Sequence, residues 1–433
     1  MTGEWKRTRE TAFFAGANSK RGFISFYEQN FRAGITRLYC IKGGPGTGKS
    51  RLLREVARAG EAAGYRSEYY YCSSDAGSLD GVILSGKNGR LGFLDATAPH
   101  LMEPQMPGAS EELLNLGEFW NTERLIRYAG DIRELNRKKA EYYRGAYRYL
   151  SAAGEMSEQL RALIRPCLNE EKMLRTARRW LREIPDGKRG EEKTAPTDSI
   201  GMTGRVRLDT YWRQGKSVLL LTDAYGSAAL FLQVLREMSA GKRLERRVSC
   251  QPLEPEWADA LWLEESGTVF LSGRSEDAPV IGAGRVFPMQ RLLYRERLSP
   301  IREEVRQAER LRRTLLEQAT GELAKAAKVH FALEEFYTSA MDFSAKEEMT
   351  LALCRRCFGG TEGLLCPRTA AAVCPALPGS GRFTGMVLPC RNSDRPSPAF
   401  LFRHHPPALL RQRRHCVRSA CAWRGGWVNP GIR

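Results

Sequence analysis

The segment IKGGPGTGKSRLL, residues 41–53, constrains the fold of this chain more than any other stretch. Its residues Gly43, Gly48, Lys49 and Ser50 meet the pattern G-x-x-x-x-G-K-[ST] of a phosphate-binding loop. The apolar, β-prone segment TRLYCIK precedes the loop, and SRLLREVARAGEAAGY, with apolar residues at helical spacing, follows it. The sequence therefore predicts a strand, a glycine-rich turn and a helix, which is the context that such a loop requires.

The residue types of this loop suit nucleotide phosphates. Glycines let backbone N–H groups approach phosphate oxygens without Cβ clashes, and the helix N-terminus adds partial positive charge. We expect Lys49 to reach the β- and γ-phosphates and the Ser50 hydroxyl to hold Mg²⁺. The predicted ligands are ATP and Mg²⁺, and the predicted nucleotide-binding residues are Gly43, Gly44, Pro45, Gly46, Thr47, Gly48, Lys49 and Ser50.

A carboxylate on the Mg²⁺ side of the site is expected at the end of another apolar strand. The segment RLGFLDATAPH supplies one, because residues 91–94 are predicted as a strand and Asp95 ends it. We predict that Asp95 supports the metal together with Ser50 and acts with Lys49 in catalysis. An aspartate that merely starts a turn is the alternative.

Two further carboxylates follow a third predicted strand, SEYYYC, in the segment SSDAGSLDG. Open α/β sheets bind ligands outside the carboxyl ends of their strands, so Asp75 or Asp80 could lie near the phosphates and position the attacking water. A turn-forming or capping role explains either residue equally well. His100 is a weaker candidate, because a lone histidine is more often structural.

The body of the chain repeats itself at a distance of about 180 residues, a pattern that indicates internal duplication. The segment SVLLLTDAYGSAALFLQVLREM, residues 217–238, matches TRLYCIKGGPGTGKSRLLREV as strand, turn and helix. Later segments follow in the same order and align Cys72 with Cys250 and Asp80 with Asp259. A chance likeness between two strand–helix units is the alternative.

The second copy lacks the residues that would bind phosphate and metal. In the alignment, Asp223 takes the place of Gly43, Ala229 of Lys49, Leu230 of Ser50 and Ser272 of Asp95. Losing the lysine, the hydroxyl and the carboxylate removes charge neutralisation at the phosphates, and Asp223 would repel them. We predict one nucleotide site, in the first copy, and a structural or regulatory second copy.

Each copy closes with a long charged helical stretch, from about Ser110 to Ile184 and from about Met289 to Tyr337. In the first stretch, basic residues alternate with aromatic ones, namely Tyr142, Tyr143, Tyr147 and Tyr149. That pattern fits single-stranded nucleic acid, but it is more typical of a helix that packs on another helix through its apolar side.

These patterns predict an α/β fold, namely a P-loop NTPase three-layer sandwich that is internally duplicated and carries long helical arms. Residues 20–195 are predicted as the P-loop domain with its arm. Residues 196–216 are polar and are predicted as a linker. Residues 217–345 are predicted as the degenerate duplicate with its own arm.

The formal net charge of +18 is concentrated near the end of the chain. Residues 351–433 contain thirteen arginines, no lysine and two acidic residues, without helical or strand periodicity. Three interpretations compete: out-of-frame translation of a GC-rich gene, a disordered basic arm for nucleic acid, and a metal site at Cys354 and Cys357. The metal site is the weakest, because the segment has no second CxxC. We favour an unstructured or frameshifted tail.

Several function classes lack their expected signatures. No apolar run approaches the about 18 residues of a membrane span, and the N-terminus does not resemble a signal peptide, so we expect a cytoplasmic protein without membrane association. The N-K-x-D motif of GTPases and the DE-x-x box of helicases are absent from the sequence. RTARRW, residues 175–180, is the nearest imitation of a kinase lid.

Taken together, the segments IKGGPGTGKSRLL, CSSDAGSLDGVIL, LGFLDATAPH, NLGEFW, AYRYLSAA and LEEFYTSAMDF resemble an uncharacterised bacterial family of tandem P-loop ATPases, ATPase- or nucleotide-kinase-like. The resemblance covers most of residues 20–345 and implies ATP binding and hydrolysis. The degraded second loop departs from a pattern with two active copies.

The sequence therefore predicts a Mg²⁺-dependent ATPase with a single N-terminal site. Hydrolysis would be slow unless a protein partner or a second protomer supplies a charge-stabilising group. The alternatives are a nucleotide or small-molecule kinase and a non-enzymatic, nucleotide-gated switch that binds nucleic acid.

Overall fold

Two six-stranded mixed β-sheets organise the part of the chain that the computed structural model describes, which is residues 4–6, 8, 10–99, 101–223, 225–282 and 284–359. The first sheet contains β2 (Thr11–Phe14), β5 (Arg37–Lys42), β6 (Arg66–Tyr71), β7 (Leu79–Gly86), β8 (Gly89–Asp95) and β9 (Glu111–Asn115). The second contains β10 (Glu192–Thr194), β13 (Ser217–Thr222), β14 (Arg246–Cys250), β15 (Ala258–Leu263), β16 (Thr268–Gly273) and β17 (Arg285–Pro288).

The two sheets have the same strand order and the same strand directions. The orders are β2-β6-β7-β8-β5-β9 and β10-β14-β15-β16-β13-β17. In both, the two ladders around the third strand are antiparallel and the other three are parallel. The chain is therefore a two-lobed α/β fold, as the sequence predicted at the level of fold class.

The first sheet buries both of its faces. Side chains alternate along a strand, so Tyr39 and Ile41 of β5 pack toward α2 (Lys49–Ala62), while Leu38 and Cys40 lie in a core on the opposite face. Helix α2 presents an apolar stripe to the first of these cores through Leu52, Leu53, Val56 and Ala57.

The core on the opposite face is shared by the two lobes. It includes Phe13 and Leu94 of the first sheet together with Leu220, Val269 and Leu271 of the second. The second face of the first sheet is thus covered by helix α1 (Tyr27–Phe31) together with the second lobe. Helices α5 (Glu170–Arg182) and α7 (Ser227–Gly241) contribute to the remaining core of the second lobe.

Shorter elements complete the described structure. They are β1 (Glu4–Lys6), β3 (Gly16–Ser19), β4 (Gly22–Ser25), α1 (Tyr27–Phe31), α3 (Thr122–Arg127), α8 (Ala278–Ile281) and the 3₁₀ segments η1 (Leu116–Phe119), η2 (Arg165–Cys167), η3 (Ser275–Asp277) and η4 (Met289–Leu292).

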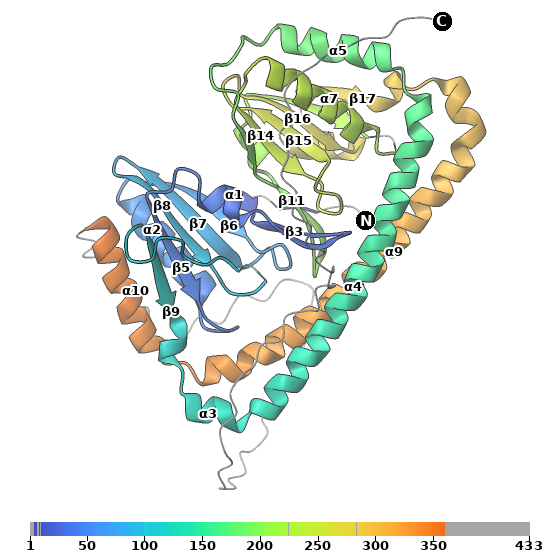
Figure 1. Ribbon diagram of the computed structural model, residues 1–433. Coiled ribbons are helices and arrows are strands. Elements are labelled where there is room, and N and C mark those ends of the chain that lie inside the picture. Colours follow the sequence, from blue (N-terminus) through green and yellow to red (C-terminus); the bar gives the residue numbers. More distant parts are fainter. Residues whose placement is uncertain are drawn as a thin grey trace, which may run out of the picture. The chain divides into compact units, whose positions relative to one another are not determined.

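Two long helices, α4 (Ala129–Ile164) and α9 (Arg295–Ser339), lie side by side (Figure 1). Ala146, Ala153 and Ala319 are fully buried between them, and Tyr143 and Tyr147 pack against the same cluster. The prediction of helix packing is confirmed for Tyr143 and Tyr147, whereas Tyr149 is exposed. The predicted start of the first arm near Ser110 is wrong, because residues 111–115 form strand β9 and pair with β5.

Residues 196–216, predicted as a polar linker, form β11 (Asp198–Gly201), β12 (Gly204–Leu208) and α6 (Thr210–Gln214). Asp198 is only 1% exposed. Its carboxylate pairs with Arg205 and lies 3.3 Å from Nε of Arg207. The segment is buried despite its polar composition, because its charges neutralise one another inside the fold.

The predicted tail starts inside a folded helix, α10 (Phe343–Phe358), which packs on α2. Cys354 belongs to the core under α2, and Sγ of Cys357 lies 3.2 Å from the Tyr39 hydroxyl. No third metal ligand accompanies these cysteines among the described residues. Residues 360–433 and His100 lie outside the described residues. None of the helices in the described part of the chain combines the length and the apolar composition needed to cross a membrane.

Candidate functional site

The glycine-rich loop, residues 43–48, joins β5 to α2 as predicted. Gly46 and Gly48 have φ angles of 70° and 79°, in the left-handed region that favours glycine. A Cβ atom on Gly46 would lie 2.6 Å from Oγ1 of Thr338 and 2.7 Å from the carbonyl oxygen of Glu334. Glycine is therefore required there both by the loop conformation and by the close approach of α9.

The N-terminus of α2 has the properties of an anion site. Its N-cap residue, Gly48, offers no side-chain acceptor. The N–H groups of the first turn have no acceptor inside the helix, and the helix dipole adds partial positive charge at this end. Phosphate oxygens would accept hydrogen bonds from these N–H groups, and their negative charge would be attracted by the positive end of the helix dipole.

The structure brings Lys49, Ser50 and Asp95 together at this end of α2. The Lys49 ammonium donates to the carbonyl oxygens of Gly43 and Gly44 at 2.9 and 2.7 Å and lies 3.6 Å from Oδ2 of Asp95. Ser50 Oγ accepts a hydrogen bond of 2.9 Å from the N–H of Leu79, at the start of β7. The lysine and hydroxyl predicted from the loop pattern and the carboxylate predicted from a separate strand thus lie in one place.

A second buried carboxylate stands beside this group. Burial raises the pKa of Asp95, and the charge of Asp80 raises it further, whereas Lys49 opposes the shift. Asp80 is 5% exposed and follows the irregular pairing of β6 with β7. Two buried carboxylates next to a hydroxyl oxygen are hard oxygen ligands, and their mutual repulsion would be relieved by a divalent cation. The residues present therefore fit Mg²⁺.

Asp75 has a structural role in addition to its position near the loop. Its Oδ1 accepts the N–H of Gly77 at 2.8 Å, and its carbonyl oxygen accepts the N–H of Ser78 at 3.0 Å. This local bonding is a turn, as the turn-forming alternative expected.

A cavity of about 880 Å³ opens in front of the loop. Its walls come from residues 43–50, from the segments after β6 and β8, and from α4 and α9. The two helices therefore form a roof over the predicted phosphate site. This roof was not predicted from the sequence, because it depends on packing between segments far apart in the chain.

Lys139 of α4 lines this cavity and was not recognised from the sequence. Burial lowers the pKa of its ammonium group, Glu334 opposes the shift, and the charge of Lys49 adds to it. Among the described residues, no group forms a hydrogen bond or an ion pair with this ammonium. Lys139 is thus a second cation near Lys49, and Glu334 is the carboxylate whose charge acts on it.

Two backbone hydrogen bonds connect the segment before α3 with the segment after α9, next to the glycine-rich loop, and we call this connection the joint. The N–H of Asn121 donates to the carbonyl oxygen of Ala340 at 2.7 Å, and that of Asp342 to the carbonyl oxygen of Phe119 at 2.8 Å. This joint keeps the rings of Trp120 and Tyr337 against Gly44, where an added Cβ would lie 3.2 Å from each.

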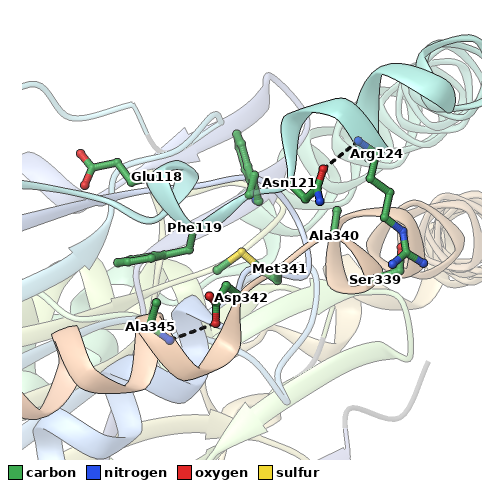
Figure 2. Close-up of a pocket in the computed structure, with 10 residues that line it drawn as sticks. Glu118, Phe119, Asn121, Arg124, Ser339, Ala340, Met341, Asp342 and Ala345 are labelled. Carbon is green, nitrogen blue, oxygen red and sulfur yellow. Dashed lines mark hydrogen bonds between the residues drawn. The ribbon is translucent and has the colours of Figure 1, made fainter. Parts of the chain in front are cut away.

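A second depression of about 470 Å³ lies at this joint (Figure 2). Two of its polar side chains already cap the N-termini of helices. Asn121 accepts the N–H of Arg124, and Asp342 accepts that of Ala345, both at 3.0 Å. These bonds are ordinary N-caps, so the depression has a structural explanation.

The corresponding connection in the second lobe, between β13 and α7, is shorter. It runs from Asp223 to the N-cap Gly226, whereas the first runs from Gly43 to the N-cap Gly48. Both N-cap glycines have left-handed φ angles, 79° and 86°. When the starts of α2 and α7 are matched, Ser227 corresponds to Lys49 and Ala228 to Ser50. The sequence alignment had put Ala229 and Leu230 at these two places, and the structure corrects it.

Strand register tests the other aligned positions. Asp95 pairs with Ile41 and Ser272 with Leu221, so these two residues hold equivalent places in their sheets, as aligned. Asp80 and Asp259 both follow an irregular pairing. In contrast, Tyr71 rather than Cys72 corresponds to Cys250, because Tyr71 pairs with Leu79 as Cys250 pairs with Ala258.

Protein groups bind one another at the start of α7 and at the end of β16 in the second lobe. The Asp223 carboxylate accepts the N–H groups of Gly226 and Ala228 at 3.0 and 2.8 Å, so an internal anion caps α7. The guanidinium of Arg207 donates to the carbonyl oxygen of Ser272 at 2.6 Å and lies 3.8 Å from Asp259. Asp223 therefore does more than repel phosphate, because it takes the place that a phosphate would occupy.

Replacing Asp223 with alanine is expected to lower the free energy of unfolding by about 1 kcal/mol, because α7 loses its cap. Thermal denaturation of the full chain measures the change. Asp186→Ala removes an exposed carboxylate that pairs with Lys242 and serves as the control, with a smaller expected effect. Equal melting temperatures for the two variants would contradict the capping role.

The first lobe thus combines an uncapped helix N-terminus, two lysines, a hydroxyl and two buried carboxylates around one cavity. In comparisons with known proteins, the chain matches no family model, no curated protein and no solved structure.

Proposed function

We propose that this protein binds ATP with Mg²⁺ in its first lobe and hydrolyses it at that single site. The observation that carries the proposal is the convergence of Lys49, Ser50 and Asp95 at the uncapped start of α2, facing a cavity of about 880 Å³. A P-loop NTPase fold and its internal duplication belong to the same proposal and are supported by the matching strand orders.

Each group has a distinct task in this proposal. The N–H groups of the loop and the Lys49 ammonium bind the β- and γ-phosphates. Ser50 and Asp95 hold Mg²⁺, which neutralises the charge that develops on the phosphate oxygens. Asp80 adds a second negative charge beside the metal and strengthens its binding.

Lys139 is the charge-stabilising group that the sequence led us to expect from a partner. Its ammonium lines the cavity without a hydrogen-bonded or ion-paired partner among the described residues. A phosphoryl group in transfer carries negative charge on its equatorial oxygens, and a positioned cation stabilises that charge. The roof helix α4 would therefore supply in the same chain what other P-loop proteins take from a second molecule.

The second lobe is proposed as a structural copy without a nucleotide. Ser227 and Ala228 replace the lysine and the hydroxyl, and Asp223 already occupies the N–H groups of the helix start. The nucleic-acid switch has less support, since Tyr143 and Tyr147 line a cavity beside α4 and α9 rather than forming a stacking surface on the outside of the protein.

Phosphate release from ATP by the full chain, with Mg²⁺ and with EDTA, tests the proposed function. We expect release that saturates with ATP and requires the metal. Release that is independent of Mg²⁺, or absence of both binding and release, would refute the proposal.

Asp95→Asn is expected to abolish Mg²⁺-dependent release and yet to stabilise the protein without ligands. Folding raises the pKa of Asp95, so its ionised form is disfavoured in the native state. That destabilisation is absent in acid, where both states are protonated, and it develops as pH rises from the unfolded pKa through the higher folded pKa. The melting temperature of Asp95→Asn should exceed that of the parent at neutral pH, and the difference should shrink in acid.

Asp186→Asn is the control for this prediction, since the Asp186 side chain is 75% exposed. A lower melting temperature for Asp95→Asn at neutral pH would show that its contact with Lys49 outweighs burial, contrary to our account.

A further inference from the structure

The cavity in front of the loop is larger than the phosphate site alone requires. Beyond the loop, the cavity continues between the helices α4 and α9 and the hairpin formed by β3 and β4. Its walls there include Phe23, Tyr143, Tyr147 and Phe331. Met202, from the turn after β11, also lines this part. We call this region the far half of the cavity, and both lobes contribute to it.

The far half adjoins the metal and γ-phosphate end of the proposed nucleotide. Ser50, the proposed metal ligand, is bonded to the N–H of Leu79, and Asp80 follows directly. On the opposite flank of the loop, Gly44 is covered by Trp120 and Tyr337. A molecule in the far half would therefore meet the reacting end of ATP, which is the position of a phosphoryl acceptor.

The walls of the far half suit a flat ring. The rings of Tyr143 and Tyr147 stack with centroids 6.2 Å apart, and Phe331 of α9 is 45% exposed although it lines the cavity. Aromatic walls favour planar heteroaromatic ligands through stacking.

Polar groups around these rings are held in fixed positions. The Tyr147 hydroxyl donates to Oδ1 of Asn18 at 3.0 Å, and Nδ2 of Asn18 donates to Oγ of Ser74 at 3.2 Å and to the carbonyl oxygen of Ile200 at 2.9 Å. A few positioned polar groups among apolar walls are typical of small-molecule sites.

The charges exclude an anionic acceptor. Among the described residues, the basic side chains that line the cavity are Lys49, Lys139 and His330, and no arginine lines it. The two lysines lie at the phosphate loop, and His330 pairs with Glu334 at 3.4 Å. Asp75 and Asp80 also line the cavity, so a second phosphate in the far half would meet carboxylates without a matching cation.

We propose that the far half binds an uncharged, nucleoside-like alcohol, a heteroaromatic ring joined to a hydroxylated sugar, as the phosphoryl acceptor. The proposal rests on the proposed ATP site. The oxygen of the acceptor hydroxyl forms a bond to the γ-phosphorus, the bond between that phosphorus and the β–γ bridging oxygen breaks, and the hydroxyl proton passes to solvent. ADP leaves with the electron pair.

The test incubates the full chain with Mg²⁺, ATP labelled in the γ-phosphate, and adenosine, guanosine, cytidine, uridine or thymidine in turn. The corresponding monophosphates form a second series. We expect label on at least one nucleoside at about ten times the rate of label released to water, and no label on the monophosphates.

Two variants locate the acceptor. Phe331→Ala should raise the KM for the nucleoside about tenfold, since stacking on one aromatic face has about that effect. Phe331 is partly exposed, so its loss should not prevent folding. Ala327→Trp fills the far half and should abolish transfer. Tyr149→Ala, on α4 but outside the cavity lining, is the control and should leave transfer unchanged.

The outcomes separate the two proposals. If the chain hydrolyses ATP but labels no nucleoside, or labels monophosphates in preference, the acceptor inference is overturned and the ATP site stands. If the chain neither binds nor hydrolyses ATP, the proposed function itself fails.

Discussion

Lys49→Ala is expected to reduce ATP turnover on the order of 10²–10³-fold, because a positioned charge at the reacting phosphates is lost. Binding of ATP should weaken as well, since Lys49 contacts the β- and γ-phosphates in the ground state. Phosphate release and equilibrium binding by the full chain measure both effects.

Lys42→Ala is the matched control. This lysine ends β5, next to the loop, and pairs with the exposed Glu103 at 2.6 Å. Its replacement should change neither quantity by more than a few-fold. A Lys49→Ala protein with parental binding and turnover would show that the loop does not hold the nucleotide.

Lys139→Met is expected to lower turnover on the order of 10²-fold or more while ATP binding changes much less. A cation that acts on the developing charge contributes in the transition state, and removal of such groups has effects of 10³–10⁵-fold elsewhere. Lys138→Met is the control, because Lys138 is exposed and lies 3.5 Å from Glu134 on the outer side of α4. Equal losses of binding and turnover in Lys139→Met would indicate a purely structural role.

The pH dependence of turnover gives a second test of Lys139. Burial lowers its pKa, so the cation is lost at a lower pH than that of an exposed lysine. Turnover should fall on the alkaline side at the same pH. Lys139→Arg keeps its charge to higher pH, so any activity that it retains should persist further into the alkaline range.

The loop and its nearest elements could be predicted from the sequence because their signals are local. A glycine pattern between an apolar strand and an amphipathic helix specified residues 43–50, and β5 and α2 form where expected. Asp95 was found for the same reason, since it ends an apolar strand whose register puts it beside Ile41.

The roof over the site could not be predicted, because it depends on tertiary packing. Lys139 lies in the run NRKKAEYY, which has the composition of a solvated helix face. Only the packing of α4 against α9 turns Lys139 and Tyr143 into the cavity. Glu334 and Thr338 reach the loop from the end of the other arm in the same way.

Composition misled the predictions where charges are satisfied inside the fold. Residues 196–216 look like a linker, yet Asp198 is buried through its pairing with Arg205 and Arg207. The sequence alignment, which contained no gap, also missed the shorter loop of the second lobe and was therefore displaced along α7. A capping aspartate at the start of α7 was the available signal, since such residues commonly cap helices.

The central claim is one nucleotide per chain, held by the first lobe. Equilibrium dialysis of the full chain with Mg²⁺ and a non-hydrolysable ATP analogue tests it most directly, with Lys49→Ala and Asp223→Ala measured beside the parent. Our account predicts one bound analogue per chain for the parent and for Asp223→Ala, and none for Lys49→Ala at the same concentration. Two bound molecules per parent chain, or binding by Lys49→Ala equal to that of the parent, would contradict it.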